Sequence, residues 1–112
     1  MAGQSEQWDA VVIGGGPAGL MAAEQLARAG HRVLVAEAKP SLARKLLMAG
    51  KSGLNLTKDE PCDDLITQYG GAQDWLAPML RDFDAEAVQD WARGLGRDLF
   101  TGSTGRVFPR EM

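Results

Sequence analysis

The stretch that decides the fold runs from residue 10 to residue 19 and reads AVVIGGGPAG. Its first four residues are apolar and rich in β-branched side chains, which predicts a buried strand over 10–13. Glycines then end the strand, and Pro17 stands where the first turn of a helix tolerates proline. The residues from Pro17 to Ala29 are mostly strong helix formers, and Gly30 follows where a left-handed cap is expected. We therefore predict a strand and then a helix with both ends marked.

A second apolar run, Val33 to Ala36, follows this helix and ends at Glu37. Strand, glycine turn, helix and strand within about thirty residues form a βαβ unit, in which the strands are parallel and the crossover is right-handed. The first half of the chain therefore predicts an α/β fold.

The turn after the first strand satisfies the spacing G-x-G-x-x-G with Gly14, Gly16 and Gly19. It follows a predicted strand and opens a predicted helix, and Glu37 ends the next strand, as the dinucleotide-binding fingerprint requires. Gly14 permits the tight turn, Gly16 lets the backbone approach a pyrophosphate, and Gly19 lets helix and strand pack closely. The helix N-terminus adds unpaired N–H groups and a partial positive charge that favour a phosphate.

The acidic residue at the end of the second strand predicts which nucleotide fits. Glu37 can accept hydrogen bonds from ribose hydroxyls, and its charge would repel a 2′-phosphate. FAD or NAD is therefore favoured over NADP, although Lys39 is close enough in sequence to soften that exclusion. The alternative is a glycine turn that merely joins strand to helix, with Glu37 in solvent.

The segment after Pro40 is less regular. Residues 41–48 could form one or two helical turns, and residues 49–57 indicate a loop. Gly50, Lys51 and Ser52 look like the tail of a phosphate-binding P-loop, but that motif needs glycine where this chain has Lys45, and no strand leads into it. We therefore exclude a nucleoside triphosphatase. The loop could wrap an anionic or polar cofactor, or lie on the surface.

The second half of the chain shows a helical period followed by strand signals. Apolar residues recur at spacings of three and four, which predicts helices over 74–81 and 85–93, with Asp84 capping the second. Gly94 and Gly96 should end the helical pattern, and 99–101 with 106–108 should form a β-hairpin. We expect Trp75 and Trp91 in the core. The acidic side chains of these helices should form a solvated face, namely Asp82, Asp84, Glu86 and Asp90.

Composition narrows the function classes. The chain has 112 residues, 45% hydrophobic and 24% charged, with net charge −3, which is ordinary for a globular domain and argues against nucleic-acid binding. No apolar run in the sequence is long enough to span a membrane, and the first nine residues are mostly polar. We therefore expect a cytoplasmic protein. Its single cysteine, Cys62, lies in an acidic, turn-like segment and offers neither an intrachain disulfide nor a thiol metal site. The single histidine, His31, is expected in solvent.

Three stretches together resemble one bacterial flavoprotein family, the BaiN-like NAD(P)/FAD-dependent oxidoreductases, also called aminoacetone-oxidase-family FAD-binding enzymes. They are VVIGGGPAGLMAA at 11–23, RKLLMAGKSGLNLT at 44–57 and GRVFP at 105–109. The first occurs in many flavoproteins, whereas the second and third are more specific. The resemblance runs from about Asp9 to the end of the chain.

The resemblance implies a Rossmann-like FAD/NAD(P)-binding βαβ unit followed by short helices and a β-hairpin. Since such proteins are several times longer, residues 1–112 would be the N-terminal part of an incomplete doubly wound FAD-binding domain. It implies that 14–19 hold the FAD pyrophosphate, that Glu37 holds the adenosine ribose, and that 45–57 line the cofactor. The expected cofactor-binding residues are Gly14, Gly15, Gly16, Pro17, Ala18, Gly19, Glu37, Ala38, Lys39, Lys45, Gly50, Lys51, Ser52, Gly53, Asn55 and Thr57.

The resemblance also implies an FAD-dependent oxidoreductase, usually with NAD(P)H as electron donor and a small-molecule substrate that the sequence does not identify. No catalytic acid or base, metal ligand or oligomeric state can be assigned, and we expect this chain alone to be inactive. Neither nucleic acid nor a membrane is expected as a partner. Two alternatives stay open: a non-catalytic nucleotide-binding or interaction module, and a fragment of an NAD-binding dehydrogenase.

Overall fold

The computed structural model describes residues 5–49 and 53–110. The chain divides into two compact units, Met1–Ala49 and Gly50–Met112, which we call the first and the second unit. The first contains strand β1 (Ala10–Ile13), helix α1 (Pro17–Arg28), strand β2 (Val33–Ala36) and helix α2 (Arg44–Ala49).

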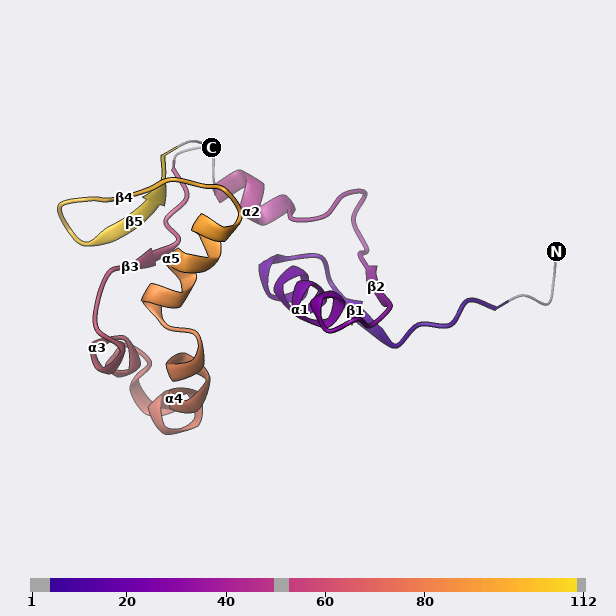
Figure 1. Cartoon of the computed structure of the whole chain (residues 1–112), viewed down its shortest axis with the longest axis horizontal. Coiled ribbons are helices and arrows are strands. Elements are labelled where there is room, and N and C mark those ends of the chain that lie inside the picture. Colours follow the sequence, from indigo (N-terminus) through magenta and orange to yellow (C-terminus); the bar gives the residue numbers. More distant parts are fainter. Residues whose placement is uncertain (1–4, 50–52, 111–112) are drawn as a thin grey trace. The chain divides into compact units, whose positions relative to one another are not determined.

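The predicted βαβ unit is confirmed. Strands β1 and β2 pair in parallel, from Ala10 opposite Val33 to Ile13 opposite Ala36. Helix α1 lies beside both strands (Figure 1). Its C-terminus is closed by Gly30, which has φ +88° and donates its N–H to the Ala27 carbonyl at 3.0 Å. The left-handed cap expected at this glycine is therefore present.

The small parallel sheet has one covered face and one open face. Burial alternates along both strands, and Val12 faces α1. On the other face, Val11 is 53% exposed, Ile13 82% and Leu34 39%. The first unit therefore leaves apolar surface uncovered on one side of its sheet.

The second unit is built from short helices and an antiparallel sheet. Its elements are strand β3 (Thr57–Lys58), helix α3 (Cys62–Thr67), a 3₁₀ turn (Gly70–Ala72), helices α4 (Gln73–Asp82) and α5 (Ala85–Gly94), and strands β4 (Leu99–Thr101) and β5 (Arg106–Pro109). The strand order is β3-β5-β4, with β5 in the middle. In Figure 1, α3 and α4 lie together at one end of this unit and the β4–β5 hairpin at the other.

The core of the second unit lies where α5 meets the sheet. Val107 is fully buried, and Ala85 and Ala92 are buried on α5. The one buried amide in the described part of this core, Gln89, donates hydrogen bonds to the Asp59 carboxylate and the Ala85 carbonyl, both at 3.3 Å. The Gln89 amide oxygen accepts a hydrogen bond from the Arg93 guanidinium at 3.5 Å, so both of its polar atoms are satisfied, as burial demands.

The predicted ends of α5 are confirmed. At its start, the Asp84 carboxylate accepts a hydrogen bond from the Ala87 N–H at 2.9 Å. At its end, Gly96 has φ +84°, its N–H donates to the Arg93 carbonyl, and the Arg97 N–H donates to the Ala92 carbonyl at 3.3 Å. This pair of bonds is a Schellman motif, which fixes the direction in which the chain leaves the helix.

The expectation of a turn-like segment around Cys62 is wrong, because Cys62 begins helix α3. Pro61 precedes the helix, and its carbonyl accepts the Leu65 N–H at 3.0 Å. Asp63 and Asp64 stand in the first turn, where the positive end of a helix favours acidic residues. The acidic composition therefore marked a helix start rather than a turn.

The expectation of a buried Trp75 is also wrong. Trp75 is 71% exposed and Met79, one turn later, is 51% exposed. Leu76 and Leu80 are instead half-buried. Adjacent helix positions differ by about 100° in direction, so the buried face of α4 lies one residue away from Trp75.

The segment predicted as a loop up to Thr57 ends in strand β3, in which Thr57 pairs with Val107 and Lys58 with Arg106. No helix among the described residues is both long enough and apolar enough to cross a bilayer.

Candidate functional site

The glycine turn between β1 and α1 depends on backbone geometry at Gly14. This residue has φ +100°, a left-handed conformation that favours glycine. Its N–H donates to the Ala36 carbonyl at 2.7 Å, which ties the turn to the end of β2. The tight turn predicted at Gly14 is therefore confirmed.

Gly19 is the point where α1 approaches the turn most closely. A Cβ built on Gly19 would collide with the Gly14 carbonyl oxygen and would lie 3.2 Å from both the Gly14 carbonyl carbon and Val12 Cγ1. Backbone atoms cannot yield as a flexible side chain can. The close packing predicted at this position is confirmed, and it leaves no room for a side chain.

Gly16 has the opposite surroundings. A Cβ on this residue would meet no described atom within 4 Å. Gly16 is also the N-cap of α1, where no side chain makes a capping bond and the first turn holds no acidic residue. The helix start therefore presents its partial positive charge and N–H groups beside open space, an arrangement that suits an anion.

The Glu37 carboxylate joins the end of β2 to this turn. One oxygen accepts the Gly15 N–H at 3.0 Å, and the other accepts the Lys39 N–H at 2.8 Å. The Lys39 and Gly15 hydrogen bonds, in that order, hold the pKa of Glu37 below its usual value. The group is therefore an anion at neutral pH, and each oxygen keeps acceptor capacity for a further hydrogen bond.

Leu42 and Ala43, which the sequence did not single out, complete the turn at Gly15. Gly15 is buried, and a Cβ on it would collide with the Leu42 side chain. The Gly15 carbonyl accepts the Ala43 N–H at 2.7 Å. Ala43 has φ +57°, which is unusual for a residue other than glycine and costs backbone strain. Since alanine gives no sequence signal for this conformation, only the structure could reveal it.

The predicted site residues fall into two groups. Pro17 and Ala18 form the first turn of α1, beside the glycine turn, and Ala38 follows Glu37. The first unit contains ten of them: 14–19 and 37–39 lie at the glycine turn and the end of β2, whereas the exposed Lys45 lies on α2 and no described contact links it to the turn.

The second group belongs to the other unit. Gly53 has φ +107°, Asn55 is exposed and Thr57 belongs to β3. Gly50, Lys51 and Ser52 lie outside the described residues. A cofactor contact by this group stays a prediction.

The single histidine and the single cysteine of the chain make local contacts. His31 is half-exposed, 3.9 Å from the Asp9 carboxylate. The Cys62 thiol donates to the Leu80 carbonyl at 3.7 Å. Over residues 5–49 and 53–110, no three His, Cys, Asp or Glu side chains gather as metal ligands would. The glycine turn with Glu37 is therefore the candidate site.

Comparison with known proteins shows what this chain is similar to. The family model of the HI0933-like protein Rossmann domain matches residues 8–112. Thiamine thiazole synthase of Methanococcus maripaludis is 31% identical over 81 residues, 72% of this chain and 31% of that protein. The enzymes of the same name from Methanococcus vannielii and Methanococcus aeolicus are 36% identical over 62 residues, 55% of this chain and 24% of theirs. The matched part of the chain thus spans 24% to 31% of the length of these relatives.

Proposed function

Because the chain belongs to the family of HI0933-like Rossmann domains, we propose that its first unit binds the ADP half of FAD in a flavin-dependent oxidoreductase. One observation carries the proposal: open space over Gly16 at the uncapped start of α1. The Glu37 carboxylate, bonded to the neighbouring Gly15 N–H, lies at the same turn. The start of α1 would bind an anion, and the Glu37 carboxylate would bind a sugar hydroxyl.

The pyrophosphate would lie over Gly16, where the backbone of the turn can approach it without a side chain between them. The N–H groups of the first turn of α1 would donate to its oxygens, and the helix dipole would stabilise its charge. The Glu37 carboxylate would accept hydrogen bonds from the adenosine ribose. Because this carboxylate is charged at neutral pH, it disfavours a 2′-phosphate at that position.

The flavin would supply hydride and electron transfer when bound. This chain would hold and orient the cofactor; residues 45–57 would line it, with Lys51, Gly53 and Asn55 nearest its flavin half. NAD(P)H is the proposed electron donor. For the substrate we propose only a class, namely a small molecule that the reduced flavin can reduce.

The test uses two glycines with equal room around them. A Cβ meets no described atom within 4 Å at either Gly16 or Gly71, and neither residue has a positive φ. Gly16→Val should lower the flavin retained per chain by at least about tenfold, because the side chain enters the space of the pyrophosphate. Gly71→Val, in the second unit, is the matched control and should retain as much flavin as the unaltered protein.

The measurement is the flavin released on denaturation of natively purified protein, together with the thermal melt of each variant. Both variants should melt as the unaltered protein does when no flavin is present. A colourless unaltered protein that releases no flavin would contradict the proposal. Full flavin content in Gly16→Val would contradict the placement of the pyrophosphate.

One alternative shares the same geometry. The glycine turn and Glu37 would bind only the ADP portion, which FAD and NAD have in common. An NAD-binding dehydrogenase would therefore use these residues in the same way. Calorimetric titration of the flavin-free protein with FAD and with NADH separates the two. Tighter binding of FAD supports the proposal, and tighter binding of NADH supports the dehydrogenase.

A further inference from the structure

A pocket of about 410 Å³ lies within the second unit, where the end of α5 meets the sheet. Its walls come from the segment before β3, from α5 and the residues that follow it, and from the end of β5. They are Leu54, Leu56, Trp91, Ala92, Leu95, Arg97 and Pro109. The volume lies within the range of pockets that hold small organic molecules.

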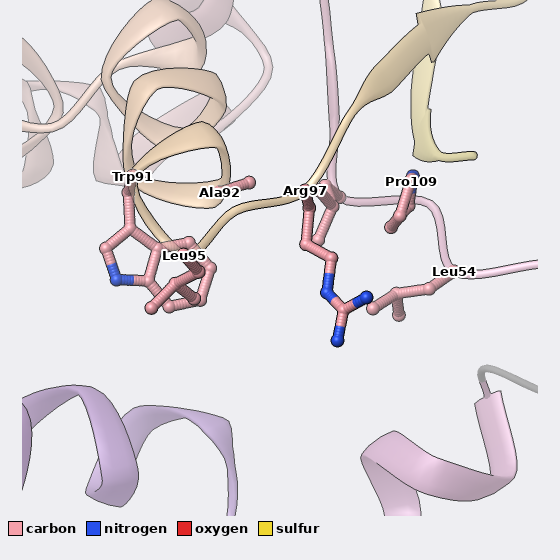
Figure 2. Close-up of a pocket in the computed structure, with 7 residues that line it drawn as sticks. Leu54, Trp91, Ala92, Leu95, Arg97 and Pro109 are labelled. Carbon is pink, nitrogen blue, oxygen red and sulfur yellow. The ribbon is translucent and has the colours of Figure 1, made fainter. Parts of the chain in front are cut away.

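The wall of this pocket is apolar apart from one side chain. Trp91 and Leu95 lie together at one side, and Leu54 and Pro109 at the other (Figure 2). Leu95 is 56% exposed although it is a large apolar residue at the edge of a hollow. Covering such a side chain with the apolar body of a ligand removes hydrocarbon surface from water, which favours binding.

The exception is Arg97. Figure 2 shows its side chain between Leu95 and Leu54 in this view. Within the described residues, no carboxylate lies within ion-pairing distance of its guanidinium group. The Arg97 backbone is fixed by the N–H bond to the Ala92 carbonyl, so the side chain starts from a defined point at the pocket edge.

The neighbouring charges leave this edge positive. Arg97, Asp98 and Arg110 line a second, smaller hollow of about 110 Å³ beside Gly96. Two arginines and one aspartate therefore line this hollow, a net charge of +1 for these three side chains. The Arg110 guanidinium lies 5.8 Å from the centre of the Phe100 ring, and Arg110 is not part of the apolar pocket.

From this arrangement we propose that the pocket binds a small carboxylic acid with an apolar body. The carboxylate pairs with the Arg97 guanidinium, whose planar fork matches two oxygens, and the hydrocarbon lies against Leu95 and Trp91. A phosphate ester fits less well, because one arginine and an otherwise apolar wall offer few donors. The proposal goes beyond the proposed ADP site, which lies in the first unit; Leu54 and Leu56 fall within the 45–57 region proposed to line the cofactor, but none of the named cofactor-binding residues lines this pocket.

The pocket carries its own fluorescent reporter in Trp91. The other tryptophans are Trp8, which lies 4.7 Å from the Arg32 guanidinium, and the exposed Trp75. Changing both to phenylalanine in the whole chain leaves Trp91 as the only tryptophan. The probe is 4-phenylbutyrate, which has one carboxylate and an apolar body, and its neutral counterpart is 4-phenylbutyramide.

The carboxylate should change the Trp91 emission saturably and bind at least about tenfold more tightly than the amide, because only the carboxylate forms a charged bond. Arg97→Gln should weaken 4-phenylbutyrate binding by about tenfold or more, and Arg97→Lys by less. Arg110→Gln is the control and should bind as the parent does. The proposal is overturned by absence of saturable binding, by equal affinity for acid and amide, or by equal losses in Arg97→Gln and Arg110→Gln.

Discussion

The two units of this chain hold themselves together in different ways. In the second unit, apolar side chains close a core, with Val107 fully buried and Ile66, Ala85 and Ala92 nearly so. In the first unit, among the described residues, the only buried position is a glycine, Gly15. The first unit is held together largely by backbone hydrogen bonds.

The comparison explains how a short segment can present a ligand site. The turn of the first unit is fixed by hydrogen bonds from Gly14 to Ala36, from Ala43 to Gly15 and from Gly15 to Glu37. The backbone conformation requires glycine at position 14, and close packing requires it at position 19. At Gly16 neither a positive φ nor a close contact requires glycine, and the open space beside a helix start without a side-chain cap would suit a bound anion.

The largest expected effect separates the two units. Gly19→Val forces a side chain into the Gly14 backbone and should destabilise the first unit by about 3 kcal/mol or more, since neither backbone can move away. Hydrogen exchange should show loss of protection over residues 10–36 and unchanged protection in α5 and β5. Unchanged protection over 10–36 would refute the close packing at Gly19.

A smaller effect is expected in the second unit. Asp84→Ala removes the side-chain cap of α5 and should lower the free energy of unfolding of this unit by about 1 kcal/mol. Asp90→Ala, on the exposed face of the same helix, removes only a surface pair with Arg93 and should cost less. If denaturant titrations gave equal losses of unfolding free energy for Asp84→Ala and Asp90→Ala, the cap would contribute no more than a surface ion pair.

The smallest expected effect is a pH dependence in the first unit. The folded pKa of Glu37 is lowered, so its charge stabilises the fold above its unfolded pKa near 4.5, and this contribution disappears as the pH falls through the folded pKa. The stability difference between the unaltered protein and Glu37→Gln should therefore be constant near neutrality and shrink below about pH 4.5. A stability difference between the unaltered protein and Glu37→Gln that grows as the pH falls below about 4.5 would refute the assignment.

The same comparison shows what the sequence could predict. Strands β1 and β2 were predicted to the residue, because a short apolar run bounded by glycine or charge is a local signal. The ends of α4 and α5 were predicted within about one residue. Strand β3 was missed because its two residues are defined only by pairing with β5, far along the chain. Helix α3 was missed because six residues are too few for an apolar period.

The candidate site was predictable where glycine spacing determines the geometry. The turn at Gly14 and the close packing at Gly19 follow from the motif and are confirmed. The hydrogen bond from Gly15 to Glu37 and the contact of Leu42 with Gly15 could not be predicted, because they depend on how the chain returns after β2. Binding of ribose by Glu37 stays a prediction.

The central claim is that the N–H groups at the start of α1 bind the diphosphate of an adenine nucleotide. The most direct test is titration of the isotope-labelled, flavin-free chain with ADP, followed by the amide resonances of each residue. The account predicts that the largest shifts arise at Gly15, Gly16, Ala18 and Gly19, and that α5 and the sheet of the second unit are unaffected. Saturating ADP that leaves the glycine-turn amides unmoved, or moves those of the second unit instead, would contradict it.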